Sequence, residues 1–561
     1  MDIPWWHQAI VYQIYPKSFK DTNSDGEGDI QGIIEKLDYL QSLGVNVLWL
    51  NPVFKSPQVD NGYDVSDYYS IDPRFGNMRT IEKLISEAKK RGLRIILDLV
   101  LNHTSDQHHW FLEARKSRDN PFRNFYIWRD GQDGKEPNNW ASFFGGSAWS
   151  CDAVTGQYYF HLFDKRMPDL NWENPEVRKR IYAVAKFWRD KGIDGFRLDA
   201  VIHLAKDTRF SDFYRSDDAD FVIAEPLYAN LPRVHDFIHE FHRELKGDHP
   251  DFLLIGEAAS ADMALARTYS DPSRKECDCV ISFRHLDTEI IHKDPRLPDG
   301  WQPEKLNFRT FKKTMQEWQR NLYGHGWMAI YWNNHDMPRL LSRFGTEGRY
   351  RVACAKMMAT LMYLQWGMPF IFQGEEMGMI NLKMPHIEDY AEPGLEAFKD
   401  QALKLGYSRN KILKMVQARS KNTSRGSMQW DDGKFGGFSD MRPWLGINEE
   451  YKTVNAAEQE KDPDSVLNYY KALFSLRKRE TVFTEGSCEL IDLKNDALYS
   501  YQRKHNGESA MVICNFTDLP RSFLYEGISS WTLLLDNLGN RDMPGDTISL
   551  APYESLVLKK R

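Results

Sequence analysis

Eight short runs of apolar, often β-branched residues recur along the chain, and stretches with helical periodicity lie between several of them. In residues 79–92 the apolar side chains recur at helical spacing, and residues 175–192 begin near a proline and end at a glycine. Continuous apolar runs are typical of parallel strands buried on both faces. Eight such strands alternating with helices predict a (β/α)8 barrel, and a doubly wound open sheet is the alternative that needs no count of eight. The runs are 9–16, 45–53, 94–102, 192–201, 252–258, 279–283, 327–336 and 369–376.

Two regions interrupt this alternation. Residues 104–174 are rich in Trp, Phe, Asn and Gly, so we expect a small inserted domain after the third strand. After about residue 480 alternating strand patterns replace the helices, and Asn506-Gly507 is a hairpin signal. The predicted organisation of the 561 residues is a barrel in 1–103 and 175–479, an inserted domain in 104–174 and a C-terminal antiparallel β-sandwich in 480–561.

The charge balance and the aromatic content exclude several classes of protein. Lys and Arg number 73 against 80 Asp and Glu, a net charge of −7, which gives no electrostatic reason to bind nucleic acid or anionic lipid. Aromatic residues make up 13% of the chain, which excludes disorder as the main state. The most apolar window, 353–372, contains Lys356, Gln365 and Pro369, so it predicts a buried helix leading into a strand rather than a membrane span.

The cysteines and the first residues indicate the compartment. Residues 1–7 lack a basic stretch followed by an apolar run, so no signal peptide is expected. Six scattered cysteines predict free thiols in a reducing cytoplasm. Cys277 and Cys279 have no second pair at zinc-finger spacing, which argues against a metal site there.

Polar clusters follow several of the apolar runs. They contain Asp98 with Asn102-His103, Arg197 with Asp199, Glu257, and His335-Asp336. A carboxylate that emerges from a buried sheet is costly unless it is paired or functional. In a (β/α)8 barrel the carboxyl ends of the strands form the floor of the active site. Four such clusters on four strands therefore predict one site.

The spacing within these clusters suggests a division of roles. Arg197 and Asp199 are two apart on a strand and share a face, so the guanidinium is expected to lower the pKa of Asp199 and keep it ionised, as a nucleophile requires. Glu257 has no adjacent cation in the sequence, which is expected to raise its pKa and suits a general acid. Cleavage of a glycosidic bond requires one carboxylate and one carboxylic acid. The alternative is a purely structural role, in which Arg197 and Asp199 form an ion pair and Glu257 makes its hydrogen bonds within the barrel.

Motifs for competing chemistries are weak. Gly145-Gly146-Ser147 is not a nucleophile elbow, and the histidines at 103, 108 and 109 lack the i, i+4 spacing of a zinc protease helix. No glycine-rich phosphate loop follows a predicted strand.

Seven sequence blocks resemble glycoside hydrolase family 13, the α-amylase family, and within it the branch of oligo-1,6-glucosidases and α-glucosidases. The resemblance covers essentially the whole chain. Four of the blocks contain the polar clusters described above, and three more are typical of the branch. They are Asp98-Leu-Val-Leu-Asn-His103, Gly195-Phe-Arg-Leu-Asp199, Ile255-Gly-Glu257 and Asn333-Asn-His-Asp336, then Gln58-Val-Asp60-Asn-Gly-Tyr-Asp64, Phe372-Gln-Gly-Glu-Glu376 and Met428-Gln-Trp-Asp431.

This resemblance assigns roles to individual residues. It implies that Asp199 is the nucleophile, Glu257 the acid/base and Asp336 the carboxylate that stabilises the transition state. The family is retaining, so the carboxyls of Asp199 and Glu257 are expected to lie roughly 5 Å apart. An Asp and an Arg close the pocket floor in this branch, so that one glucose is released from the non-reducing end. Here they are Asp60 and Arg425, with Arg419 as a competing alignment for the arginine. The residues implied to hold or enclose the glucosyl ring are Tyr63, Asp98, His103, Phe144, Phe163, Arg197 and His335.

An acidic loop suggests a structural cation. Oxygen ligands at positions 1, 3, 5 and 9 and a glycine at position 6 resemble an EF-hand loop, but position 12 is Gly32 rather than Glu. The branch binds calcium at this loop, with magnesium as the alternative metal. A purely structural Asx-rich turn without metal is the other interpretation. The predicted ligands are Asp21, Asn23, Asp25, Glu27 and Asp29. No organic cofactor is expected.

Three departures from the branch bear on linkage preference. Ala200 follows the nucleophile, where Val accompanies α-1,6 preference and Ala or Thr accompanies α-1,4. Met167 and Met337 stand where the branch usually has Gln, which removes amide hydrogen bonds near the sugar. The resemblance therefore implies an exo-acting retaining α-glucosidase for short α-gluco-oligosaccharides, with α-1,4 or mixed α-1,4/α-1,6 preference.

Other activities on the same scaffold remain open. They are an oligo-1,6-glucosidase with strict α-1,6 preference, a sucrose isomerase or transglucosylase, and a trehalose-6-phosphate hydrolase. Residues 289–307 lack the Arg-Leu-Asp-Arg-Asp run of the isomerases. A catalytically inactive relative, such as a transporter heavy chain, is disfavoured because all three acids are present. The expected partner is an oligosaccharide or disaccharide, with no nucleic acid and no membrane, and the protein is expected to be a monomer or a weak homo-oligomer.

Overall fold

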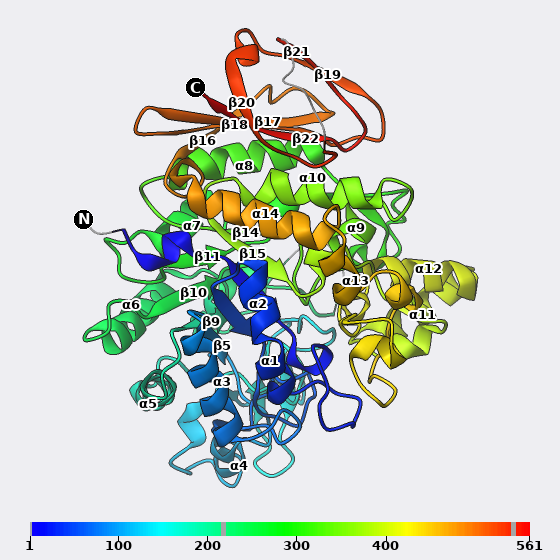
Figure 1. Cartoon of the computed structure of the whole chain (residues 1–561). Coiled ribbons are helices and arrows are strands. Elements are labelled where there is room, and N and C mark those ends of the chain that lie inside the picture. Colours follow the sequence, from blue (N-terminus) through cyan, green and yellow to red (C-terminus); the bar gives the residue numbers. More distant parts are fainter. Residues whose placement is uncertain (1–2, 215–219, 540–545) are drawn as a thin grey trace. The chain divides into compact units, whose positions relative to one another are not determined.

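The computed structural model describes residues 3–214, 220–539 and 546–561. The chain divides into two compact units (Figure 1). Unit 1 consists of Met1–Leu48, Glu87–Leu93 and Phe283–Arg561. Unit 2 consists of Trp49–Ser86 and Arg94–Ser282.

Eight strands form one sheet in the order β11-β10-β9-β5-β2-β1-β15-β14. In unit 2, β9 pairs in parallel with β5 and with β10, and in unit 1, β15 pairs in parallel with β1 and with β14. Each strand overlaps one of the eight apolar runs, so the (β/α)8 barrel prediction is confirmed. The strands are β1 (Val11–Ile14), β2 (Val47–Leu50), β5 (Arg94–Val100), β9 (Gly195–Asp199), β10 (Leu253–Glu257), β11 (Cys279–Ile281), β14 (Ala329–Ile330) and β15 (Met368–Phe372).

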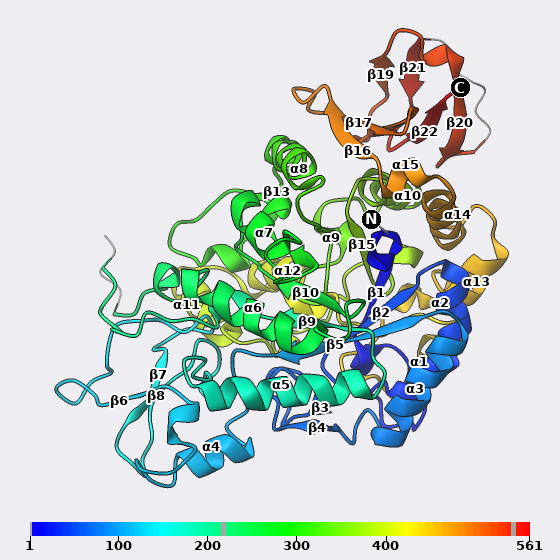
Figure 2. The same ribbon diagram turned by 90° about the vertical axis from the view of Figure 1, so that its left-hand side faces the viewer.

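In unit 2 the buried strands carry polar residues at their carboxyl ends. All five residues of β9 are buried, because this strand lies between β5 and β10 and is covered on both faces. Helix α5 (Pro175–Asp190) begins at the cap Asn174 with a proline in its first turn, as predicted, and packs beside α6 (Pro232–Lys246) (Figure 2). The remaining elements are β3 (Phe54–Lys55), β4 (Asp67–Ile71), α3 (Met78–Lys90, which extends into unit 1), α4 (His109–Ala114), β6 (Trp128–Arg129), β7 (Trp149–Cys151), β8 (Tyr158–Phe160) and α7 (Met263–Ser270). Strands β6, β8 and β7 form a small sheet within residues 104–174.

In unit 1 helix α10 (Arg351–Tyr363) is buried on nearly all sides and leads into β15. This confirms the prediction of a buried helix followed by a strand at 353–372. Within the described part of the chain, no helix is long and apolar enough to cross a membrane. The other helices and short strands are α1 (Ile30–Glu35), α2 (Leu37–Leu43), β12 (Thr288–Ile290), β13 (Glu304–Leu306), α8 (Phe308–Leu322), α9 (Leu340–Arg343), α11 (Leu395–Lys404), α12 (Arg409–Arg419), α13 (Ala456–Lys461), α14 (Val466–Arg479) and α15 (Thr481–Thr484).

The end of unit 1 is an antiparallel β domain, as predicted. Its five-stranded sheet, in the order β16-β17-β18-β22-β20, lies beside α8 and α10 (Figure 1). Asn506 and Gly507 join β17 to β18 with positive φ angles of 46° and 86°, the backbone that favours Asn-Gly in a tight hairpin. The strands are β16 (Ser487–Ile491), β17 (Leu498–His505), β18 (Glu508–Asn515), β19 (Arg521–Leu524), β20 (Trp531–Asp536), β21 (Thr547–Leu550) and β22 (Ser555–Lys560). The predicted boundaries of the three domains stay predictions.

Candidate active site

One guanidinium lies at the centre of the polar cluster in unit 2. Arg197 Nη1 is 2.7 Å from Asp98 Oδ1 and 2.5 Å from Asp199 Oδ1, and its Nη2 is 2.7 Å from Glu257 Oε1. The register of the sheet explains the arrangement, because Arg197 pairs with Asp98 on one neighbouring strand and with Ile255, two residues before Glu257, on the other. The expectation that Glu257 lacks a cation is therefore wrong. Its cation comes from the adjacent strand, which sequence distance does not reveal.

Burial governs the protonation of this cluster. It raises the pKa of Asp98 to about 6. It also raises the pKa of Asp199 well above its usual range; Arg197 opposes this rise, and the charges of Glu257 and Asp98 add to it. The direction for Asp199 is opposite to the one expected from Arg197 alone. Three carboxyls around a single cation are most stable when they retain a proton, so the cluster contains both an acid and a base.

The backbone after Asp199 orients Glu257. Ala200 adopts a left-handed conformation with φ of 46°, which is uncommon for a residue other than glycine. Its backbone N–H donates a hydrogen bond to Glu257 Oε2 at 2.9 Å. Both oxygens of Glu257 are thus held, one by Arg197 and one by this amide. Alanine does not favour that backbone, so this contact could not be predicted from the residue types.

Three donors hold the second oxygen of Asp98. Tyr63 Oη and Asn51 Nδ2 each donate to Asp98 Oδ2 at 3.2 Å, and Trp49 Nε1 donates at 3.1 Å. Tyr63 was predicted, but Trp49 and Asn51 were missed. The available signal was their position at the end of the second apolar run, the same position that identified the other clusters.

His103 is buried and neutral. Asn102 Nδ2 donates to His103 Nδ1 at 3.2 Å, and burial lowers the pKa of His103 to about 4. The proton therefore lies on His103 Nε2. The ring of Phe163 lies 5.1 Å from that of His103, and Phe144 contacts Phe163 at 5.8 Å. An apolar wall beside the N–H of an imidazole suits a ligand rich in hydroxyl groups.

Asp60 lies in a turn near this histidine. Its N–H donates to Asp64 Oδ1 at 3.0 Å, and its carbonyl accepts from the N–H of Tyr63 at 3.1 Å. The charge of Asp60 opposes the fall in the pKa of His103, which places the two side chains within electrostatic reach. Met167 is fully buried, so its side chain packs in the interior of unit 2.

A second cluster lies in unit 1. Asp336 Oδ2 is 3.1 Å from His335 Nε2, and its Oδ1 is 3.0 Å from Arg425 Nη2. Arg425 also donates to the carbonyl of His335 at 2.7 Å and stacks over Tyr15 at 5.2 Å. Arg419, the competing arginine, pairs with Glu304 instead.

Three neighbours of this second cluster were not predicted. Gln13 Nε2 lies 2.8 Å from His335 Nδ1, Tyr15 packs against the His335 ring, and Lys421 Nζ is 4.0 Å from Asp336 Oδ1. Gln13 and Tyr15 both lie within the first apolar run, where their polar groups were the available signal. Met337, which follows Asp336 in the sequence, is buried.

The acidic loop of unit 1 is closed by its own hydrogen bonds. Asp21 accepts from the N–H groups of Asn23, Ser24 and Gly26 at 2.8–2.9 Å. Asp29 caps α1 through Gly32 N at 2.7 Å, and Glu27 pairs with Lys17 at 3.2 Å. Asn23 Nδ2 donates to Asp25 Oδ2 at 3.1 Å. Within residues 3–214, 220–539 and 546–561, no group of three or more His, Cys, Asp or Glu is arranged to hold a metal ion. Calcium at this loop stays a prediction.

The chain is similar to known proteins in both sequence and structure. The sequence model of the alpha-amylase catalytic domain matches residues 13–486. The chain is 43% identical to an oligo-1,6-glucosidase of Parageobacillus thermoglucosidasius, over 100% of both chains. It is similar to the crystal structure of Bacillus licheniformis trehalose-6-phosphate hydrolase, with a TM-score of 0.92, 42% identity and coverage of 99% of this chain and 100% of the other. It is also similar to the trehalulose synthase of Pseudomonas mesoacidophila MX-45, with a TM-score of 0.90, 38% identity and full coverage of both.

Proposed function

Because the chain belongs to the alpha-amylase family of glycoside hydrolases, we propose that it is an exo-acting, retaining α-glucosidase. Its substrates are short α-gluco-oligosaccharides, from which it releases the glucosyl unit at the non-reducing end. The observation that carries this proposal is the guanidinium of Arg197, which contacts the carboxyls of both Asp199 and Glu257. Two carboxyls that share one guanidinium lie close together. Close carboxyls, about 5 Å apart rather than about 6.5–9.5 Å, suit a retaining reaction.

The reaction needs two steps. In the first, Asp199 attacks the anomeric carbon while Glu257 donates its proton to the glycosidic oxygen, so that the leaving sugar departs as an alcohol and a glucosyl ester forms. In the second, Glu257 takes a proton from water, whose oxygen attacks the anomeric carbon and releases Asp199 as a carboxylate. Two inversions give net retention. The contact of Arg197 with Asp199 stabilises the carboxylate that must be present before the first step and after the second.

The residues around these carboxyls are proposed to bind the glucosyl unit. His103 is proposed to donate to a sugar hydroxyl, and Phe163 and Phe144 supply an apolar wall. Tyr63 and Arg197 hold Asp98, whose carboxyl is then fixed to accept hydrogen bonds from the sugar. Asp60 is proposed to contribute to the floor of the pocket.

Three residues of unit 1 are proposed to take part by their match to the family motifs. Asp336 is the carboxylate that stabilises positive charge in the transition state, and His335 and Arg425 hold it through opposite oxygens. The contact with Asp336 supports Arg425, rather than Arg419, as the arginine of this group. His335 is fixed in turn by Gln13.

The linkage preference is proposed to be α-1,4 or mixed. The residue after the nucleophile is Ala200, in a left-handed backbone that a β-branched side chain adopts only with strain. The small methyl group leaves more room beside the reacting bond than valine would. The relatives differ in their named activities, so strict α-1,6 hydrolysis, isomerisation and hydrolysis of a phosphorylated disaccharide are the alternatives that a substrate survey must separate.

Glucose release from maltose, isomaltose, sucrose, trehalose and trehalose 6-phosphate, measured in parallel, tests the proposal. Release mainly from maltose, with the α-anomer appearing first by proton NMR, would support it. Release mainly from isomaltose would establish the strict α-1,6 alternative. Conversion of sucrose to an isomer would establish the isomerase, and activity on trehalose 6-phosphate alone would establish hydrolysis of a phosphorylated disaccharide. The variants Asp199→Asn and Glu257→Gln serve as controls, and wild-type turnover in either would overturn the mechanism.

We also propose that the enzyme works in the cytoplasm as a monomer or weak homo-oligomer. All six cysteines are free thiols and five are buried, which suits a reducing compartment. Fractionation of cells and light scattering during size-exclusion chromatography test these two points. Secretion of the active protein, or a stable oligomer at micromolar concentration, would contradict them.

A further inference from the structure

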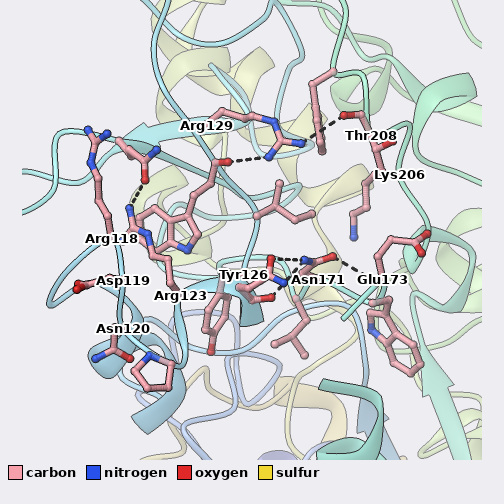
Figure 3. A pocket seen from close by; sticks show the side chains of 18 of the residues that line it. Arg118, Asp119, Asn120, Arg123, Tyr126, Arg129, Asn171, Glu173, Lys206 and Thr208 are labelled. Carbon is pink, nitrogen blue, oxygen red and sulfur yellow. Dashed lines mark hydrogen bonds between the residues drawn. The ribbon is translucent and has the colours of Figure 1, made fainter. Parts of the chain in front are cut away.

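Unit 2 contains a cavity of about 540 Å³ that the catalytic proposal does not use. Its walls come from residues 118–129, with contributions from residues 157, 170–173 and 204–210 (Figure 3). Asp199, Glu257 and His103 are not among the residues that line it. In Figure 3, Arg129 donates to Thr208, which lies beside Lys206, and Arg123 lies farther away in the same view.

The lining is rich in cations, and two of them lack an acidic partner. Lys206 is paired with Asp169 at 2.9 Å, and Arg118 with Asp130 at 3.0 Å. Arg123 and Arg129 have no carboxylate within ion-pair distance among the described residues. Their bonded acceptors are neutral: Arg123 donates to Ala114 O, Thr155 Oγ1 and Gln157 Oε1, and Arg129 to Trp128 O and Thr208 O.

The carboxylates that line the cavity do not neutralise these two guanidiniums. Glu173 is paired with Arg233 at 3.4 Å. Asp119 is exposed to solvent, so water screens its charge. An excess of positive charge therefore remains on the wall of the cavity.

Two of the aromatic residues that line the cavity, Trp128 and Phe210, stack against these cations. The guanidinium of Arg123 lies 3.4 Å over the ring of Trp128, and that of Arg129 lies 4.6 Å over the ring of Phe210. Stacking in this way occupies the aromatic face but leaves the N–H edge of the guanidinium available. Arg123 Nε and Trp128 Nε1, on side chains that are only 8% exposed, have no acceptor among the described residues.

We propose that this cavity binds the phosphate group of a small phosphorylated molecule. Phosphate supplies several acceptor oxygens and the negative charge that Arg123 and Arg129 lack, and a planar guanidinium donates to it in pairs. The amides of Asn120 and Asn124 also line the cavity and can hydrogen-bond the hydroxyl groups of an attached sugar. Free inorganic phosphate and a hexose phosphate share the recognised group, and the experiment separates them.

Occupancy of the cavity reaches the catalytic cluster through Lys206. Its Nζ donates to Asn102 Oδ1 at 2.7 Å and pairs with Asp169, which also accepts from Asn102 Nδ2 at 3.0 Å. The same amide donates to His103. A second anion beside Lys206 competes with Asp169 for its charge, so it changes the orientation of Asn102 and His103. This step rests on the proposed function, because it assigns His103 to the glucosyl pocket.

Isothermal titration with inorganic phosphate and with glucose 6-phosphate tests the binding site directly and needs no activity. The wild-type protein is expected to bind at least one of them with a millimolar or lower Kd, and Arg129→Gln is expected to weaken binding about tenfold or more. Arg209→Gln is the matched control, since Arg209 is exposed, paired with Asp207 and absent from the lining. Tighter binding of glucose 6-phosphate than of phosphate identifies a sugar phosphate, and equal binding identifies the free ion. Absence of binding of either, or equal affinity in Arg129→Gln and the wild type, would overturn the site.

The steady-state KM for 4-nitrophenyl α-glucoside, measured with and without the bound anion, tests the coupling. The anion is expected to change KM in the wild type and in Arg209→Gln but not in Arg129→Gln. Binding without a change in KM would keep the site and overturn the coupling. A change that persists in Arg129→Gln would assign the anion to the catalytic pocket and overturn both. Inactivity of every variant on this glucoside would contradict the proposed function while the titration still decides the site.

Discussion

Replacement of Arg197 by lysine should damage catalysis far more than the conservation of charge suggests. Arg197 reaches Asp98 and Asp199 through Nη1 and Glu257 through Nη2. A lysine ammonium is a single point of charge and cannot span three carboxyls on three strands. We expect two of the three contacts to be lost in Arg197→Lys.

The magnitude follows from those contacts. A hydrogen bond to a charged group contributes about 1.5–3 kcal/mol, so two lost contacts amount to about 3–6 kcal/mol. If most of this stabilises the ionised nucleophile and the oriented acid, kcat/KM falls by about 10²–10⁴-fold. The pKa of Asp199, already raised by burial, rises further because its opposing cation is weakened. Asp199 must be ionised to attack, so the acid limb of the kcat/KM profile moves to higher pH.

The assay is the pH dependence of kcat/KM on the best substrate of the survey, for the wild type, Arg197→Lys and the control Arg209→Lys. Arg209 is an exposed arginine of the same unit that pairs with Asp207, so its replacement should leave the profile unchanged. Thermal unfolding midpoints verify that all three proteins are folded. A loss of less than tenfold in Arg197→Lys, together with an unmoved acid limb, would refute the reasoning.

Three further predictions concern unit 1. Arg425→Lys should lower kcat/KM about 10–100-fold through the loss of its contact with Asp336 Oδ1. Arg419→Lys, whose arginine pairs with Glu304, should stay within a few-fold of the wild type. Equal losses of kcat/KM in the two variants would contradict the assignment. Burial raises the pKa of Glu375 to about 8. The folded state therefore keeps a proton that the unfolded state releases above about pH 4.3. As the pH rises from there to about 8, the free energy of unfolding falls by at most about 1.4 kcal/mol per pH unit. Thermal midpoints at pH 5 and pH 8 should therefore differ less in Glu375→Gln than in the wild type, and an equal difference would refute this sign. If residues 21–29 hold calcium, elemental analysis of the purified protein should find about one ion per chain. Chelation should then lower the thermal midpoint of the wild type but not that of Asp21→Ala. Metal-free protein with an unchanged midpoint would favour the Asx-rich turn.

The sequence was sufficient to predict the fold because its signals are local. A buried parallel strand needs a continuous apolar run, and each of the eight observed strands coincides with such a run. The hairpin at Asn506-Gly507 and the proline start of α5 are equally local. These features depend on the chemistry of adjacent residues, which a single sequence contains.

The candidate site was predictable only in its residue types. The positions at strand ends identified Asp98, Arg197, Asp199 and Glu257, but not Trp49 and Asn51, whose position at a strand end looked the same and whose side chains carry no charge. The hydrogen bond from Ala200 N–H to Glu257 depends on a backbone angle that alanine does not favour. Such features become visible only when the backbone is known.

The error over Glu257 has a general cause. Sequence adjacency placed Arg197 beside Asp199 and left Glu257 without a cation, yet the parallel register places Arg197 opposite Ile255 and so within reach of Glu257. In a sheet, the neighbours that determine a pKa lie on adjacent strands, here more than fifty residues away in the chain. Two carboxyls with opposite duties therefore share one guanidinium, and their difference must come from the other contacts of each. Glu257 is held by the N–H of Ala200, and Asp199 is more deeply buried. Glu257 gives its proton to the leaving oxygen in the first step and takes one from water in the second, so a carboxyl held at both oxygens can act as acid and then as base without any movement of the backbone.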